Sequence, residues 1–222
     1  MDTNSIIENS RKSMQFPNYI TAVSTEFTNP YCMVPSGKKF LSEMGFLNQN
    51  SSEIKKLAND IIEIISNPID RNIAIEIGLF RGGTHLIWKS LFNQVISIDR
   101  DLSSIMFFAP LVQPGSRFIW GDSKKLETIN ALDCMLAYIR NVSFLFIDGD
   151  HSYNGVLTDW KNYSPFVRKG GIICFHDLMK SRDSNVNTFI SELEKGQHGK
   201  SYKINKICYE KDDYGIGYYI QE

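Results

Sequence analysis

The chain lacks several features that would assign it to a special class of protein. It has only four cysteines in 222 residues and no C-x-x-C pair, and a chain of this size needs neither disulfides nor a structural metal to fold. Neither sign of charge is in excess, because 24 lysines and arginines face 25 aspartates and glutamates, so nucleic acids and membranes are not expected partners. No apolar run approaches the roughly 20 residues that cross a bilayer, and residues 1–9 do not resemble a secretory signal. The sequence therefore predicts a soluble, cytoplasmic protein.

A repeated unit dominates the middle of the chain: a short apolar run, an acidic residue near its end, and then a helical stretch. Strands are expected at Ile73–Ile77, Val95–Ile98, Phe118–Trp120, Val142–Ile147 and Gly171–Phe175. Helices are expected at Ser52–Ser66, Gly83–Leu91, Ser123–Ile139 and Tyr153–Tyr163. The acids fall at positions 76, 99, 122, 148 and 177, a spacing that suits a strand plus a crossover helix of at most about 30 residues. The predicted fold class is α/β, with a doubly wound, mostly parallel sheet.

The two ends of the chain depart from this unit. Tyr202–Cys208 and Gly215–Ile220 are strand-like runs joined by a short polar stretch, which predicts a C-terminal antiparallel hairpin and a total of seven strands. Residues 1–50 carry scattered aromatic side chains among Asn, Ser and Thr. We therefore expect an N-terminal arm or lid over residues 1–51 and one domain over residues 52–222.

Glycines follow the first strand in the run Glu76-Ile-Gly78-Leu-Phe80-Arg-Gly82-Gly83-Thr84. Gly78 permits a sharp turn, and Gly82 with Gly83 opens the next helix without an obstructing side chain. In open α/β sheets, ligands bind where the strands end at this edge. The spacing G-x-x-x-G-G differs from the G-x-G-x-x-G of dinucleotide sites, which weakens the interpretation as a nicotinamide-dependent enzyme.

Acidic residues decide which ligand suits this edge. Glu76, Asp99 and Asp122 are expected to point into one crevice, which disfavours a phosphate anion and favours a ligand with an ammonium, a sulfonium and a ribose diol. S-adenosylmethionine has all three. Asp99 is placed to accept both ribose hydroxyls, and Asp122 is placed beside the base. An N-cap of the following helix is the structural alternative for Asp122, and it is compatible with ligand binding.

Several of these strand ends resemble class I S-adenosylmethionine-dependent methyltransferases, namely Glu76–Thr84, Ile96–Asp99, Gly121–Ser123 and Phe146–Tyr153. The last of them, together with Gly170–Asp177, is similar to the metal-dependent O-methyltransferases of the macrocin and catechol type and to the cephalosporin-hydroxylase-like group. The resemblance covers about residues 52–220 and implies a Rossmann-like methyltransferase fold. It also implies that the cofactor is bound by Glu76, Gly78, Phe80, Gly82, Gly83, Thr84, Asp99, Gly121, Asp122 and Ser123.

The same resemblance implies a metal site and a general base. By position, the family's divalent-cation ligands correspond to Asp148, His176 and Asp177, and its base corresponds to His151, with Asp148 and His151 as the catalytic pair. His176 departs from the family's acidic pair. As a ligand it would shift the metal preference from magnesium towards manganese, iron or zinc, and without it only two protein ligands remain. Magnesium or manganese is the expected ion.

The residues themselves agree with part of this assignment. Asp148 and Asp177 end adjacent strands of the predicted sheet, so a cation could bridge their carboxylates. A bound dication would lower the pKa of a hydroxyl, and His151 has a suitable intrinsic pKa to accept the proton. The structural alternative for Asp148 to Asp150 is a turn that closes the strand.

The expected function is therefore metal-assisted O-methylation of a small hydroxylated acceptor, such as a sugar, a polyol or a natural product, by a protein that could be a homo-oligomer. Two alternatives stay open: an NAD-dependent oxidoreductase, and a catalytically silent domain that binds S-adenosylmethionine.

Overall fold

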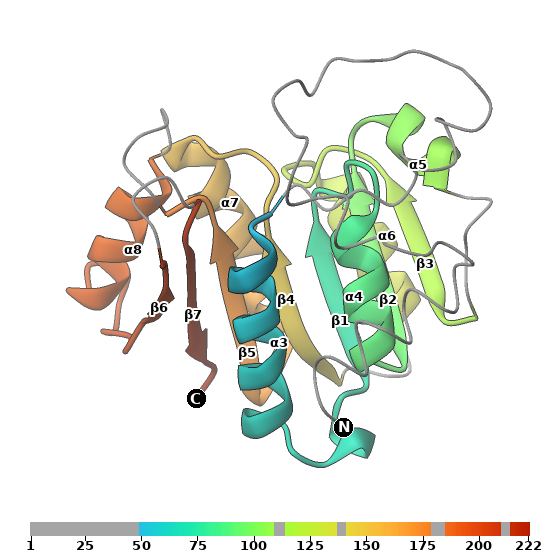
Figure 1. The fold of residues 1–222 in the computed structure, drawn as a ribbon. Coiled ribbons are helices and arrows are strands. Elements are labelled where there is room, and N and C mark those ends of the chain that lie inside the picture. Colours follow the sequence, from blue (N-terminus) through green and yellow to red (C-terminus); the bar gives the residue numbers. More distant parts are fainter. Residues whose placement is uncertain (1–48, 109–113, 137–140, 179–184, 210–213) are drawn as a thin grey trace.

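A seven-stranded sheet forms the centre of the chain, with the strand order β3-β2-β1-β4-β5-β7-β6 (Figure 1). The computed structural model describes residues 49–108, 114–136, 141–178, 185–209 and 214–222. The strands are β1 (Ile73–Ile77), β2 (Gln94–Asp99), β3 (Ser116–Trp120), β4 (Val142–Ile147), β5 (Val167–His176), β6 (Asn205–Ile207) and β7 (Ile216–Ile220). The first five are parallel, and β7 runs antiparallel to both β5 and β6. The predicted doubly wound sheet and its C-terminal hairpin are confirmed.

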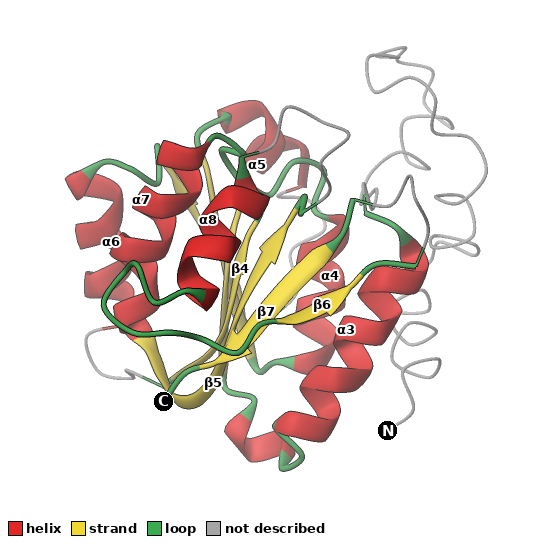
Figure 2. Cartoon of the chain, turned by 90° about the vertical axis from the view of Figure 1, so that its left-hand side faces the viewer, coloured by secondary structure: helices red, strands yellow, loops and turns green. Residues whose placement is uncertain are grey.

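Helices cover both faces of this sheet (Figure 2). They are α3 (Ser51–Ile64), α4 (Gly83–Leu91), α5 (Leu102–Phe108), α6 (Leu126–Leu136), α7 (Tyr153–Tyr163) and α8 (Val186–Glu194), with short 3₁₀ turns at Pro68–Asp70 and Ser164–Phe166. Apolar residues of α3 and α4 pack on one face, and those of α6, α7 and α8 pack on the other. Burial on both faces explains why β1 and β4 are apolar along most of their length.

The crossover connections bring the carboxyl ends of β1 to β5 to one edge of the sheet. The chain order reverses between β1 and β4, which are neighbours in the sheet although β2 and β3 lie between them in sequence. This switch point is where an open α/β sheet forms its ligand crevice. No helix within the described ranges combines the length and the apolar character needed to cross a membrane.

The structure differs from the predicted helices at α5, α6 and α8. α6 begins at Leu126 instead of Ser123, because the Asp122 side chain accepts the Lys124 N–H at 3.0 Å and forms a turn before the helix. α5 and α8 were not expected, although Val186, Phe189, Ile190 and Leu193 follow helical spacing and are buried. The expected lid over residues 1–51 lies outside the described residues, apart from its last three positions.

Candidate functional site

A cavity of about 520 Å³ opens at the carboxyl edge of the sheet, and residues from the ends of all five parallel strands line it. Eight of the ten residues expected to bind the cofactor are part of the lining: Gly78, Phe80, Gly83, Thr84, Asp99, Gly121, Asp122 and Ser123. The four residues expected to bind metal or transfer protons, Asp148, His151, His176 and Asp177, line the same cavity. Glu76 and Gly82 lie outside the lining. The structure therefore brings the two predicted groups together in one cleft.

The turn after β1 depends on glycine at two positions. Gly78 has φ +93°, and a Cβ at this position would lie 2.2 Å from the main-chain oxygen of Asp148, which directly follows the neighbouring strand β4. Gly82 has φ +75° and is the N-cap of α4. Both conformations are disfavoured for residues with a side chain. Gly78 therefore allows the end of β1 to approach β4 closely, where the cleft meets the predicted metal site.

Asp99, at the end of β2, holds this turn in place. Its Oδ2 accepts the main-chain N–H groups of Leu79 at 2.9 Å and Phe80 at 3.0 Å, and its Oδ1 accepts that of Asp101 at 2.8 Å. A carboxylate offers about four acceptor positions. About one position is left toward the cleft, where a hydroxyl of the ligand can donate.

Glu76 is fully buried beneath the cleft and accepts a hydrogen bond from the hydroxyl of Ser97 on β2. Burial raises the pKa of Glu76 to about 8, although the hydroxyls of Ser97 and Thr84 offset part of this effect. The Ser97 hydroxyl is also 2.7 Å from Nδ1 of His85, whose Nε2 is 2.8 Å from the Ser116 hydroxyl. Hydrogen-bonded polar side chains thus connect Glu76 on β1 to Ser116 on β3, past β2. Glu76 lies below the surface of the cleft and does not line it.

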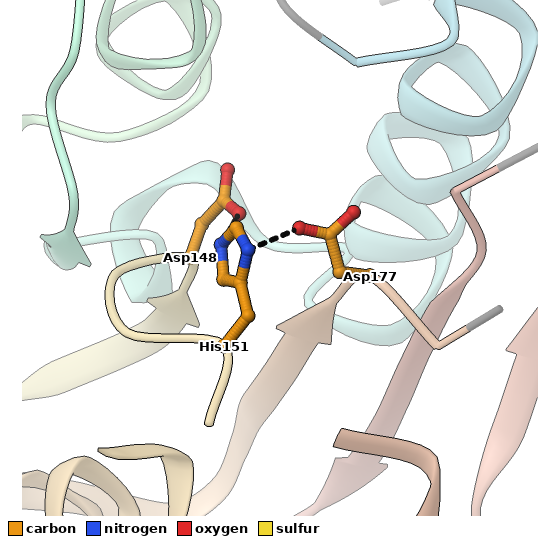
Figure 3. A group of neighbouring side chains, drawn as sticks. All are labelled: Asp148, His151 and Asp177. Carbon is orange, nitrogen blue, oxygen red and sulfur yellow. Dashed lines mark ion pairs between the residues drawn. The ribbon is translucent and has the colours of Figure 1, made fainter. Parts of the chain in front are cut away.

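Three side chains gather where β4 and β5 end (Figure 3). Asp148, His151 and Asp177 each offer one ligand atom, and these atoms all lie within 4.8 Å of one another. Nδ1 of His151 is 2.9 Å from Oδ2 of Asp177, and its Nε2 is 3.3 Å from Oδ1 of Asp148. The imidazole therefore lies between the two carboxylates, while 44% of the His151 side chain remains exposed toward the cavity.

His176 lies behind these three side chains. Its Nδ1 is 3.1 Å from Oδ1 of Asp148 and 3.5 Å from Oδ1 of Asp177, and only 3% of its side chain is exposed. Its Nε2 is buried and has no hydrogen-bond partner among the described residues. The three-residue cluster thus contains His151 where the sequence predicted His176 as the third ligand, and His176 contacts both carboxylates from the protein interior.

The charges of the cluster shift its pKa values in opposite directions. Hydrogen bonds with Asp148 and then Asp177 raise the pKa of His151 to about 10. Burial alone would lower the pKa of His176, but the charge of Asp148 and the hydrogen bonds with both carboxylates outweigh it and raise the pKa. Burial alone would raise the pKa of Asp177, but hydrogen bonds with His151 and His176 lower it. Two carboxylates and an accessible imidazole form a donor set that suits a divalent cation.

The cavity lining includes several residues that the sequence did not indicate, and two of them contact the side chains at the ends of β4 and β5. Gln49 is only 8% exposed, and its Nε2 donates to Oδ2 of Asp148 at 2.6 Å. The ring of Tyr214, just before β7, stacks on that of His176 with 5.5 Å between their centroids. Both residues lie in connecting segments without a motif, so no local pattern could have indicated them.

Comparisons with protein families and curated proteins find a methyltransferase domain and one relative. Residues 75–178, from within β1 to just beyond β5, match a family described as a methyltransferase domain. The chain has the fold of a class I methyltransferase. Uncharacterized protein R132 of Acanthamoeba polyphaga mimivirus is 29% identical to it over 172 residues, which are 67% of this chain and 74% of that protein.

Solved methyltransferase structures share the fold at low sequence identity. The MycE methyltransferase from the mycinamycin biosynthetic pathway, in complex with Mg and SAH, has a TM-score of 0.54 at 18% identity; the match covers 75% of this chain but only about half (49%) of MycE. A candidate caffeoyl-CoA O-methyltransferase from Staphylococcus aureus has a TM-score of 0.56 at 13% identity over 99% of both chains. An rRNA methylase from Streptococcus thermophilus has a TM-score of 0.56 at 10% identity over 79% of this chain and 99% of the methylase. These likenesses show the fold and leave the acceptor open.

Proposed function

We propose that this protein transfers the methyl group of S-adenosylmethionine to a hydroxyl of a small molecule, and that a divalent cation assists the transfer. The observation that carries the proposal is the cluster of Asp148, His151 and Asp177 inside the cleft that Gly78 and Asp99 also line. Binding of the cofactor alone would need only the end of the cleft that Gly78 and Asp99 line. The two carboxylates with an imidazole between them indicate chemistry on an acceptor.

The cofactor end of the cleft suits a cationic ligand. Asp99 and Asp122 line it, whereas buried Glu76 beneath it keeps its proton near neutral pH because burial raises its pKa to about 8. S-adenosylmethionine supplies an electrophilic methyl group on a positively charged sulfur, which the side chains of Asp99 and Asp122 favour. The same charges disfavour the pyrophosphate of NAD. The order of glycines and acids therefore supports a methyl donor over the nicotinamide alternative.

The other end of the cleft suits an acceptor hydroxyl. Asp148 and Asp177 would hold the cation, and a bound dication would lower the pKa of a nearby hydroxyl. His151 is the exposed member of the cluster and is placed to accept the hydroxyl proton. It must be neutral to do so, and a cation held by Asp148 and Asp177 would lower its pKa from about 10 by neutralising the two carboxylates that raise it.

Binding and transfer measurements on matched variants test this proposal. Isothermal titration of the wild-type chain with S-adenosylhomocysteine (SAH) and with Mn²⁺ is expected to show both ligands binding. Transfer of labelled methyl groups from S-adenosylmethionine to a panel of catechols, sugars and polyols is expected to stop after chelation and to return with Mg²⁺ or Mn²⁺. Asp148→Ala and Asp177→Ala are expected to keep SAH affinity while losing Mn²⁺ binding and transfer.

Asp70→Asn is the matched control, because Asp70 is exposed in the 3₁₀ turn before β1, at the opposite edge of the sheet. It is expected to behave as the wild type. Binding of NAD without binding of SAH would contradict the proposed cofactor. SAH binding without any metal binding would instead support the silent-domain alternative.

A further inference from the structure

The middle of α7 carries a carboxylate that the proposed chemistry does not use. Asp159 has no exposed surface, and it does not line the cleft. Its Oδ1 accepts a hydrogen bond from the hydroxyl of Ser123 at 2.6 Å, whereas its Oδ2 is buried without a partner in the part of the chain that the structure describes. A buried carboxylate with one unpaired oxygen costs free energy, so packing alone does not explain this residue.

The hydrogen bond from Ser123 connects α7 to the wall of the cleft. Ser123 follows β3 and lines the cavity together with Gly121 and Asp122, where the base of the cofactor is expected. One turn beyond Asp159, the hydroxyl of Tyr163 donates to the main-chain oxygen of Ser123 at 2.9 Å. α7 therefore holds both the side chain and the main chain of Ser123.

The unpaired oxygen of Asp159 faces the next strand end. A Cβ at Gly149 would lie 3.5 Å from Oδ2 of Asp159. Gly149 directly follows Asp148 and also lines the cavity. Asp159 thus lies beneath the loops that follow β3 and β4, where the cofactor side and the metal side of the cleft meet.

We propose that Asp159 is a positioning residue for cofactor binding, which holds the Gly121–Ser123 loop in its ligand-binding shape through the hydroxyl of Ser123. This role rests on the proposed function, since it assumes that S-adenosylmethionine occupies the cleft. Ser123 is the contact with the ligand side, and Asp159 acts only through it. Metal binding depends on other strand ends and is independent of this contact.

Isothermal titration with SAH tests the role of Asp159 through a double-mutant cycle. Asp159→Ala and Ser123→Ala each remove the same charge-assisted hydrogen bond, and each is expected to raise the Kd for SAH about tenfold. The double variant is expected to raise it by no more than either single variant. Asp159→Asn keeps an oxygen toward Ser123 and is expected to stay within about threefold of the wild type.

One further measurement and one control variant separate positioning from general stability. Mn²⁺ affinity is expected to stay unchanged in all of these variants. Thr158→Ala is the matched control on α7, because among the described residues its hydroxyl bonds within the helix alone, to the main-chain oxygen of Asn154. If Asp159→Ala fails to fold, Ser123→Ala and Asp159→Asn still report on the contact.

Two results would overturn the role of Asp159. One is a lowered Tm of Asp159→Ala with unchanged SAH affinity. The other is a double variant whose rise in the Kd for SAH is the product of the rises in the two single variants. A wild-type chain that does not bind SAH contradicts the proposed function. Wild-type binding with unaffected Asp159 and Ser123 variants contradicts only the positioning role.

Discussion

Asp99 fixes the backbone of Phe80: its Oδ2 accepts the Phe80 N–H at 3.0 Å, and Phe80 has φ +48°, which is unusual for a residue with a side chain. The same oxygen accepts the N–H of Leu79 at 2.9 Å. One carboxylate at the end of β2 therefore shapes the turn after β1 and still faces the cleft. The charge of Asp99 and the shape of the cofactor turn cannot be altered independently.

Asp99→Asn tests this double role. The amide replaces one acceptor oxygen by a donor that faces main-chain N–H groups, so at least one hydrogen bond to a charged acceptor is lost, at a cost of about 1.5–3 kcal/mol. We expect the Kd for SAH in isothermal titration to rise at least about tenfold, together with a lowered Tm. Asp70→Asn, away from the cleft, should change neither quantity. An Asp99→Asn variant with wild-type SAH affinity would contradict this interpretation.

Gly78→Ala and Gly199→Ala form a matched pair, because both glycines have positive φ but only Gly78 has close neighbours. A Cβ at Gly78 would lie 2.2 Å from the main-chain oxygen of Asp148, whereas one at Gly199 meets nothing within 4 Å. Gly199→Ala should cost only the backbone penalty of about 1–2 kcal/mol. Gly78→Ala should cost about 3 kcal/mol or more, since a main-chain clash is added, and should abolish SAH binding. Urea denaturation and SAH titration measure both effects, and equal losses of stability would contradict the assigned clash.

Much of the fold was predictable because each strand carries its signal locally. Val142–Ile147 is continuously apolar, and the structure ends β4 at the predicted residue, before Asp148. The spacing between the acids at successive strand ends suits one crossover helix each, so the sequence also indicated which acids meet at the carboxyl edge of the sheet. α8 was missed although its four buried residues have helical spacing, because it follows an unusually polar stretch.

The details of the site were less predictable, because they depend on how side chains of separate elements turn toward one another. The sequence places His151 and His176 near the same two carboxylates, but only the structure puts the ring of His151 between them and buries His176. The same holds for Asp159, which reads as an ordinary polar residue of a helix until Ser123 is found beside it. Gln49 reaches Asp148 across 99 residues of sequence.

The burial of Glu76 predicts a stability that falls as the pH rises. Its pKa is raised from 4.5 to about 8, mainly by burial, so the folded chain keeps a proton that the unfolded chain releases between these values. The contribution to stability is fully present below pH 4.5 and is lost as the pH rises through 8, by at most about 1.4 kcal/mol per pH unit.

Glu76→Gln should reduce this dependence, because the amide has no proton to release in this range, while His151 and Asp159, whose pKa values are also raised, keep their contributions. Urea denaturation at several values between pH 5 and pH 8 measures the slope of the unfolding free energy. Glu127→Gln, at an exposed position of α6, should keep the slope of the wild type. A Glu76→Gln variant with the wild-type slope would show that other groups cause the pH dependence.

His151 is the residue whose removal best separates binding from chemistry. Its ring lies between Asp148 and Asp177, yet 44% of the side chain is exposed to the cavity, so a small molecule can take its place. His151→Ala should lower kcat for methyl transfer by about 10²- to 10⁴-fold, the usual contribution of a general base, while SAH affinity stays within about twofold. Lys161→Gln, at an exposed position of α7, should leave kcat unchanged.

Added imidazole should restore part of the lost rate in His151→Ala, because it can occupy the vacated space and accept the proton. A kcat near that of the wild type would exclude His151 as the base. So would a loss of kcat that imidazole does not reverse and that comes with a loss of SAH binding.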